Sequence, residues 1–245
     1  HDALPILRLL SHHMLNSDAP DHTRLRGLVN QAFTTRMVEQ LHGRIETIAH
    51  DLLGTVAAQR SADLIAAYAL PLPIIVIADL LGVPSRDYHR VRAWSNALVA
   101  PNADSARSAK KLAKAGALME DFIAYLRAIF AARRAKPRDD LISSLLAAEE
   151  AGDVLSENEL FSMILLLIVV GHETTVNLIG NGVLALLQHP EQLDRLRREP
   201  ALISGAVEEM LRYDCPVERA PMRYASEDVL IGDTWVRRGD AVSVV

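Results

Sequence analysis

A group of polar side chains interrupts the most apolar stretch of this sequence. Residues 160–170 are almost entirely apolar, and the sequence Gly-His-Glu-Thr-Thr follows directly at 171–175. A buried polar group without a hydrogen-bond partner costs about 1 to 3 kcal/mol, so such a group indicates a cavity, a partner or a cofactor beside the chain. A structural explanation is equally open, because a threonine hydroxyl often bonds the carbonyl one turn back in its helix.

Gly171 and Val176 limit the kinds of site that this polar group can form. A glycine has no side chain, so another group can approach the helix backbone closely at Gly171. A zinc-protease site of the His-Glu-x-x-His type would need a second histidine where Val176 stands. The sequence therefore places a carboxylate and two hydroxyls beside a point of close approach.

Other charged residues have helical spacing. His22 and Arg26 are four residues apart, so they can bind an anionic group from one helix face, although the spacing alone favours a solvated helix start. Glu209 and Arg212 are three residues apart, the spacing of an ion pair on a helix surface. Arg223 precedes a strand-like segment, and the sequence shows no partner for it.

The elements that carry these residues are mostly helices. Ser156 and Glu159 have the spacing of a capping box, in which the two side chains satisfy backbone N–H groups at a helix start. The helix that follows, about 157–188, has no proline before Pro190 and would span about 45 Å. Over about 217–245, short apolar runs separated by Gly and Asp predict strands and turns. The sequence predicts a mainly α fold with a small β-rich portion.

Composition excludes several classes of protein. The 245 residues carry 26 basic and 31 acidic side chains, a net charge of −5, so we expect no nucleic-acid partner. The single cysteine, Cys215, excludes an intramolecular disulfide and fits a cytoplasmic location. The apolar run at 160–170 is far shorter than the roughly 20 residues that cross a bilayer, so we expect no membrane span. Without an initiator Met, and with a strand-like last segment, the chain is expected to be truncated at both ends.

Taken in order, the segments 18–26, 170–175, 209–214 and 219–228 resemble the bacterial soluble cytochromes P-450. The resemblance covers nearly the whole chain, and the combination of 170–175 with the Glu-x-x-Arg sequence in 209–214 makes it specific. It implies a mainly helical fold that encloses haem b, held by a cysteine thiolate that favours O–O cleavage. Residues 1–245 would then be part of one P-450 domain.

The resemblance also assigns roles to residues of the long helix. Gly171 would lie beside the haem and the oxygen pocket, where the helix is distorted. Thr174 would hydrogen-bond dioxygen or its water, and Glu173 would help to relay protons. O–O cleavage consumes protons, which a hydroxyl fed by a carboxylate can deliver without admitting bulk water. Val170 stands where this family usually has Ala or Gly, so its side chain is expected to crowd the pocket.

The remaining charged residues would bind the cofactor or support the scaffold. By resemblance, His22, Arg26 and Arg223 would pair with the haem propionates, because buried carboxylates need cations beside them. Glu209 and Arg212 would form an internal ion pair that is structural and takes no part in catalysis.

The family's axial cysteine lies in a Phe-x-x-Gly-x-His-x-Cys-like loop after the last strands, and no such loop occurs before Val245. Cys215 directly follows the Glu-x-x-Arg helix, so its position excludes it as that ligand. We therefore expect the axial cysteine beyond Val245, no metal ligand within residues 1–245, and no activity from this chain alone.

The function implied by the resemblance is that of a haem-thiolate monooxygenase, which inserts one oxygen atom from O2 into a small apolar organic substrate. A ferredoxin or flavodoxin with its reductase would supply the electrons. Two alternatives stay open. One is a non-catalytic helical binding protein on a P-450-like scaffold, and the other is an inactive fragment without haem.

Overall fold

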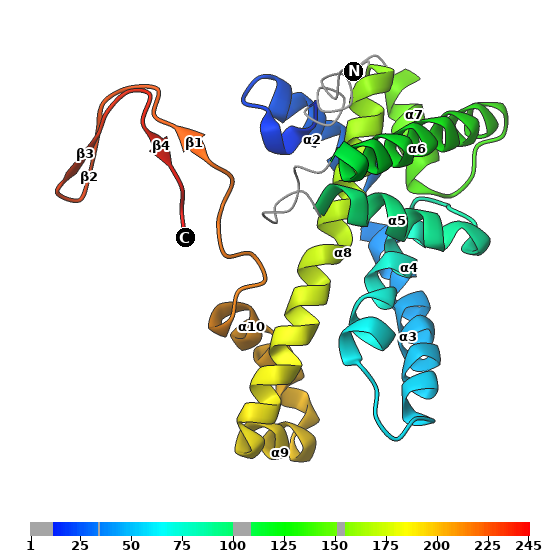
Figure 1. Ribbon diagram of the computed structural model, residues 1–245, viewed down its shortest axis with the longest axis vertical. Coiled ribbons are helices and arrows are strands. Elements are labelled where there is room, and N and C mark those ends of the chain that lie inside the picture. The colour runs from blue at the N-terminus through cyan, green and yellow to red at the C-terminus, as the bar shows by residue number, and fades with distance from the viewer. Residues whose placement is uncertain (1–11, 34, 100–108, 151–154) are drawn as a thin grey trace. The chain divides into compact units, whose positions relative to one another are not determined.

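The computed structural model describes residues 12–33, 35–99, 109–150 and 155–245 (Figure 1). The chain forms two compact units, His1–Val176 and Asn177–Val245. Helices dominate the described residues, and strands occur there only as short pairs between Arg223 and Val242. The predicted mainly α class with a small β-rich portion is therefore confirmed.

Helices and short helical turns build the first unit. Within it, α7 packs against α2 and α6, and α4 packs against α3 and α5. In chain order the elements are η1 (Met14–Asn16), α2 (Asp21–Ala32), α3 (Thr35–Ala57), η2 (Ile65–Ala69), α4 (Pro71–Leu80), η3 (Ser85–Asp87), α5 (Tyr88–Val99), α6 (Ala109–Ala135), α7 (Leu141–Glu150) and the first part of α8 (Glu157–Gln188).

The core of the first unit is aliphatic, with a few aromatic rings. Phe130 of α6 stacks on Phe161 of α8 with ring centroids 5.3 Å apart. Trp94 of α5 meets Phe122 of α6 edge-on, also at 5.3 Å. All four rings are at most 1% exposed, and most residues of α8 from 160 to 168 are buried with them. The beginning of α8 is therefore a central element of this core.

The capping box predicted for the start of α8 is present. The Ser156 N–H donates to Glu159 Oε2 at 2.8 Å, and the Glu159 N–H donates to Ser156 Oγ at 3.2 Å. Each side chain thus satisfies a backbone donor that the helix leaves without an internal acceptor. This closure fixes where α8 begins, at Glu157, and hence which of its residues reach the core.

Length and composition alone would allow α8 to cross a membrane, because its most apolar window has a mean hydropathy of 1.7. The expectation of no membrane span considered only the uninterrupted apolar run, which is shorter than the helix. In this structure 39% of the window is buried inside protein. Core helices of globular proteins pass the same test, so hydropathy does not distinguish the two environments.

A buried ion pair joins α6 to α7 beside the end of α4. Arg133 Nε donates to Asp140 Oδ2 at 2.6 Å, and both side chains are at most 6% exposed. Arg133 Nη2 also donates to the Gly82 carbonyl at 2.9 Å. Gly82 has a φ of +69°, and a Cβ there would lie 2.2 Å from Asp140 Oδ2. Only glycine therefore suits this position.

The second unit contains the rest of α8, then α9 (Pro190–Arg198), η5 (Pro200–Leu202) and α10 (Ile203–Tyr213). Its strands form two antiparallel pairs: β1 (Arg223–Tyr224) with β4 (Ala241–Val242), and β2 (Val229–Ile231) with β3 (Thr234–Val236). Gly232, with a φ of +57°, makes the turn between β2 and β3. These pairs are the β-rich portion that the alternation after Pro216 predicts.

Candidate functional site

The polar segment 171–175 lies where α8 emerges from the core of the first unit. Ile168 is 1% exposed and His172 is 4% exposed, whereas Val170 is 47% exposed. Glu173 and Thr174 are half-buried. Neither side chain is sealed among neighbouring leucines, so both can meet a group that lies against this part of the helix.

The Thr174 hydroxyl bonds its own helix. Its Oγ1 donates to the Val170 carbonyl at 3.0 Å, the arrangement that the structural explanation of this segment predicts. A hydroxyl has one hydrogen and two lone pairs, so Thr174 Oγ1 still accepts a hydrogen bond from another donor. The observed bond is therefore compatible with a structural role and with a proton-relaying role.

The close approach predicted at Gly171 is made by Ile77 of α4. A Cβ built on Gly171 would lie 3.2 Å from Ile77 Cδ1, and its three nearest atoms all belong to this isoleucine. That distance is shorter than an ordinary contact between carbon atoms, which is about 3.5 to 4.0 Å. The glycine therefore lets α4 and α8 pack closely, a function that the sequence pattern did not reveal.

His172 is a polar residue of the site that the sequence interpretation left without a role. Its Nδ1 lies 2.8 Å from the Ile168 carbonyl oxygen, one turn back in α8. Ser95 Oγ of α5 lies 3.2 Å from His172 Nε2 and 3.4 Å from Nδ1. A signal was present in the sequence, because His172 continues the helical spacing of buried positions that passes through Ile168. No signal in the sequence indicated the partner of His172, because Ser95 is 77 residues away along the chain.

The three residues predicted to bind the cofactor's propionates have no acidic partner among the residues that the structure describes. His22 is half-buried and Arg26 is exposed on α2, while Arg223 is exposed on β1. Within the described part of the chain, no side-chain bond or ion pair of these three is recorded. Arg24 differs, because it bonds Glu159 and lies 3.6 Å from Asp21.

The chemistry of these three donors fits a carboxylate ligand such as a haem propionate. His22 and Arg26 belong to the first unit, and Arg223 belongs to the second. Each of them has N–H donors to offer an anion, whereas the guanidinium of Arg24 is already engaged with protein carboxylates. On α2, His22 and Arg26 are therefore available to an anion, whereas Arg24 has a structural role.

Glu209 and Arg212 form a two-point ion pair on α10. Arg212 Nε donates to Glu209 Oε2 at 2.7 Å, and Nη2 donates to Oε1 at 2.6 Å. The hydrogen bonds from Arg212 lower the pKa of Glu209 from its ordinary value. Both side chains are exposed in this structure. The hydrogen bonds match the predicted spacing, but the exposure differs from the internal pair that the resemblance implied.

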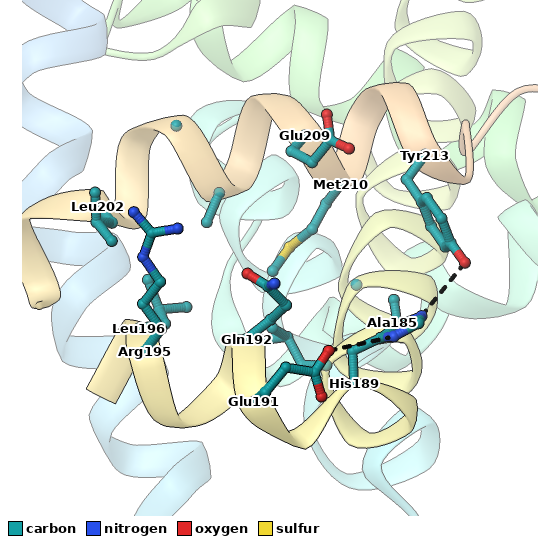
Figure 2. A pocket seen from close by; sticks show the side chains of 14 residues that line it. Ala185, His189, Glu191, Gln192, Arg195, Leu196, Leu202, Glu209, Met210 and Tyr213 are labelled. Atoms are coloured by element: carbon teal, nitrogen blue, oxygen red, sulfur yellow. Dashed lines mark hydrogen bonds and ion pairs between the residues drawn. The ribbon is translucent and has the colours of Figure 1, made fainter. Parts of the chain in front are cut away.

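A cavity of about 490 Å³ lies within the second unit, between the end of α8, α9 and α10 (Figure 2). Gly182, Gly205 and Glu209 belong to its lining. At its edge His189 lies between Tyr213 and Glu191, with ring nitrogens 3.5 Å from the tyrosine oxygen and 3.7 Å from the carboxylate. The sequence did not predict this cavity, and none of the residues 170–175 lines it.

No group of three or more His, Cys, Asp or Glu side chains that could hold a metal ion occurs among the residues that the structure describes. Cys215 is exposed just after α10.

Comparison with known proteins identifies the class. Residues 89–245 match the family model of cytochrome P450. This chain therefore belongs to the cytochrome P450 family, as the resemblance of its motifs indicated.

Relatives of the same family match most of the chain. The polyketide biosynthesis cytochrome P450 PksS of Bacillus subtilis is 46% identical over 235 residues, which are 96% of this chain and 56% of PksS. Cytochrome P450 107B1 of Saccharopolyspora erythraea is 48% identical, with the same coverage. The crystal structure of the myxobacterial cytochrome P450 CYP267B1 with myristic acid is similar with a TM-score of 0.87 and 46% identity, over 98% of this chain and 59% of that one. The chain thus spans little more than half the length of these relatives.

Proposed function

We propose that this chain is part of a haem-thiolate monooxygenase, which inserts one atom of O2 into a small apolar organic substrate. Membership of the cytochrome P450 family supports the class. The observation that carries the proposal is the position of Glu173 and Thr174, which are half-buried where α8 leaves the core of the first unit. A carboxylate and a hydroxyl in such a place can exchange protons with a bound ligand while the helix core excludes water.

Haem b, when bound, supplies the oxygen chemistry. The residues of this chain supply protons and order around it. Thr174 would accept a proton on an Oγ1 lone pair while its own hydrogen turns from the Val170 carbonyl to the bound ligand, and Glu173, the next residue, would replace that proton from solvent. Gly171 is proposed to lie beside the cofactor as well as against Ile77. The exposed side chain of Val170 would narrow the space for substrate.

His22, Arg26 and Arg223 are proposed to bind the two haem propionates. Burying a carboxylate without a cation is costly, and charge-assisted hydrogen bonds from arginine are among the strongest that a protein offers. Glu209 and Arg212 are proposed to stay a structural pair, because each already satisfies the charge of the other. We propose that the axial thiolate comes from a cysteine beyond Val245, and that residues 1–245 alone are inactive.

The partners and setting follow from the same proposal. Electrons would come from a ferredoxin or flavodoxin with its reductase. An apolar substrate is supported by the myristic acid bound to the related CYP267B1. We propose a cytoplasmic bacterial enzyme without a nucleic-acid partner or a membrane span, in which residues 1–245 belong to a single P450 domain.

One observation favours a second candidate. Because Thr174 Oγ1 already bonds the Val170 carbonyl, the polar segment is explained in part without a ligand. The same scaffold would then be a non-catalytic helical binding protein, or a fragment that binds no haem.

Spectroscopy of the haem-loaded protein tests the proposed class. The reduced, full-length gene product under carbon monoxide is expected to show the thiolate-type Soret band. A haem-bound product without that band would contradict the proposal. Haem titrated into the 245-residue chain tests the fragment alternative, and we expect no thiolate-type band there, because its only cysteine is Cys215.

A further inference from the structure

Two buried polar side chains connect α5 to α8 beside the proposed proton-relaying residues. Ser95 is 1% exposed and His172 is 4% exposed. The Ser95 hydroxyl oxygen lies 3.2 Å from His172 Nε2 and 3.4 Å from Nδ1. The buried residues of this core are mostly aliphatic, so a purely space-filling role would be served by apolar residues without the cost of burying polar atoms.

The partners of His172 assign the hydrogens on its ring. The Ile168 carbonyl can only accept, so the Nδ1 at 2.8 Å from it must carry a hydrogen. The Ser95 hydroxyl lies almost equally far from the two ring nitrogens, so it contacts the imidazole as a whole. The ring is thus held by a carbonyl of its own helix and by a hydroxyl of α5.

The helix period relates this contact to the catalytic candidates. At about 100° per residue, Val170 and Thr174 point within about 20° of the direction opposite His172. Gly171 points about 100° away from His172 and meets Ile77 of α4. The contacts of His172 with α5 and of Gly171 with α4 therefore restrain the rotation of α8 in two directions.

We propose that His172, through Ser95, is a positioning residue, which fixes the rotation of α8 and so holds Glu173 and Thr174 toward the substrate side. The proposal rests on the proposed monooxygenase function. His172 touches neither substrate nor cofactor in this account. It acts through the orientation of the turn that contains Val170 and Thr174.

The test uses variants that keep the core filled. His172→Phe preserves a buried ring and removes both polar contacts, and Ser95→Ala removes the hydroxyl that faces the imidazole. His172→Gln keeps an amide that can both donate and accept. Ser144→Ala is the matched control, because the Ser144 hydroxyl bonds only a carbonyl of its own segment, that of Asp140 at 3.3 Å, among the contacts recorded for the described residues.

Two measurements are made on the haem-loaded, full-length protein. Hydrogen exchange of the amides of residues 170–176 is compared with that of α6. Peroxide released per O2 consumed is measured with myristic acid as the trial substrate. We expect His172→Phe and Ser95→Ala to accelerate exchange at 170–176 about tenfold, with α6 unchanged, and to raise the peroxide fraction. His172→Gln should restore both values in part, and Ser144→Ala should change neither.

Other outcomes would overturn the inference. Equal acceleration in α6 and at 170–176 would make His172 an ordinary core residue. Local acceleration with an unchanged peroxide fraction would remove its link to catalysis. Both outcomes are measured on protein that shows the thiolate-type band with carbon monoxide. Absence of that band from the wild-type protein would instead refute the proposed function.

Discussion

Arg24 on α2 bonds the carboxylate of Glu159, the same carboxylate that accepts the Ser156 N–H at the start of α8. One side chain therefore ties α2 to the helix that carries the candidate site. Burial acts to raise the pKa of Glu159, but the hydrogen bonds from Ser156 and Arg24 outweigh burial, and the pKa is lowered. The partial positive charge of the helix N-terminus favours the carboxylate as well.

Glu159→Gln should lower the free energy of unfolding by about 1 to 3 kcal/mol at pH 7, because it replaces the charged hydrogen bond between Arg24 and Glu159 by a neutral one. Since the folded-state pKa of Glu159 is lowered, its contribution is complete above the ordinary value of 4.5 and is lost as the pH falls through the folded value. Urea unfolding at several pH values measures this, and the difference from wild type should shrink below pH 4.5.

The control for that experiment is Glu157→Gln. Glu157 is 47% exposed and pairs with the exposed Arg127, so its loss should cost less than about 1 kcal/mol. Equal losses from both variants would contradict a special role for Glu159.

Gly171→Ala should stabilise the chain less than a Gly→Ala substitution at an uncrowded helix position. Replacing glycine in a helix interior gains about 0.5 to 1 kcal/mol, and Gly54→Ala in α3 should show this gain, because no atom lies within 4 Å of its built Cβ. At Gly171 the new Cβ meets Ile77 at 3.2 Å, so part of the gain is lost.

A double-mutant cycle with Ile77→Val checks this explanation by thermal or urea unfolding of all four proteins. Removing the Cδ1 methyl of Ile77 should restore part of the gain from Gly171→Ala, because the Cγ1 atom at 3.3 Å remains. Additive effects of the two substitutions would show that the contact between Ile77 and Gly171 is not the cause.

The sequence predicted α8 and its start well, because the signals are local. Ser156 and Glu159 are three residues apart, and the apolar run follows them directly. The contacts that define the site are not local. Ile77 meets Gly171, and Ser95 meets His172, across long stretches of chain whose packing no periodicity specifies. The motif thus pointed to candidate residues, while only the fold shows which side chains pack against them.

The cavity of the second unit was missed for a similar reason. Gly182, Gly205 and Met210 have unremarkable positions in the sequence, and the hollow arises only where α8, α9 and α10 pack. Helical spacing already places Arg24 on a different face from His22 and Arg26, but the sequence named no partner for it. The structure distinguishes them, because Arg24 bonds Glu159 and the Arg26 side chain has no recorded partner among the described residues.

Arg26→Gln should therefore weaken haem binding, whereas Arg24→Gln should lower the free energy of unfolding. In the haem-loaded protein, Arg26→Gln is expected to accelerate haem transfer to excess apomyoglobin about tenfold, because a charged hydrogen bond to a propionate is lost. The free energy of unfolding of the haem-free protein should change by less than about 0.5 kcal/mol, since Arg26 is exposed.

Arg24→Gln should lower the free energy of unfolding and leave the intrinsic rate of haem transfer nearly unchanged. The reverse assignment, with Arg24→Gln releasing haem and Arg26→Gln destabilising the haem-free protein, would show that the wrong residue of α2 has been placed at the propionates.

The central claim is that Thr174 passes protons to oxygen bound beside α8. It is tested most directly by the peroxide released per O2 consumed in Thr174→Ala, with Thr174→Ser and Thr47→Ala as comparisons. Thr47 makes the same bond to a carbonyl one turn back, at 2.9 Å to Gly43, at an exposed position of α3. We predict that Thr174→Ala diverts most O2 to peroxide and lowers product formation about tenfold or more, while the other two variants behave like wild type. The same peroxide fraction in Thr174→Ala as in Thr47→Ala would contradict the account.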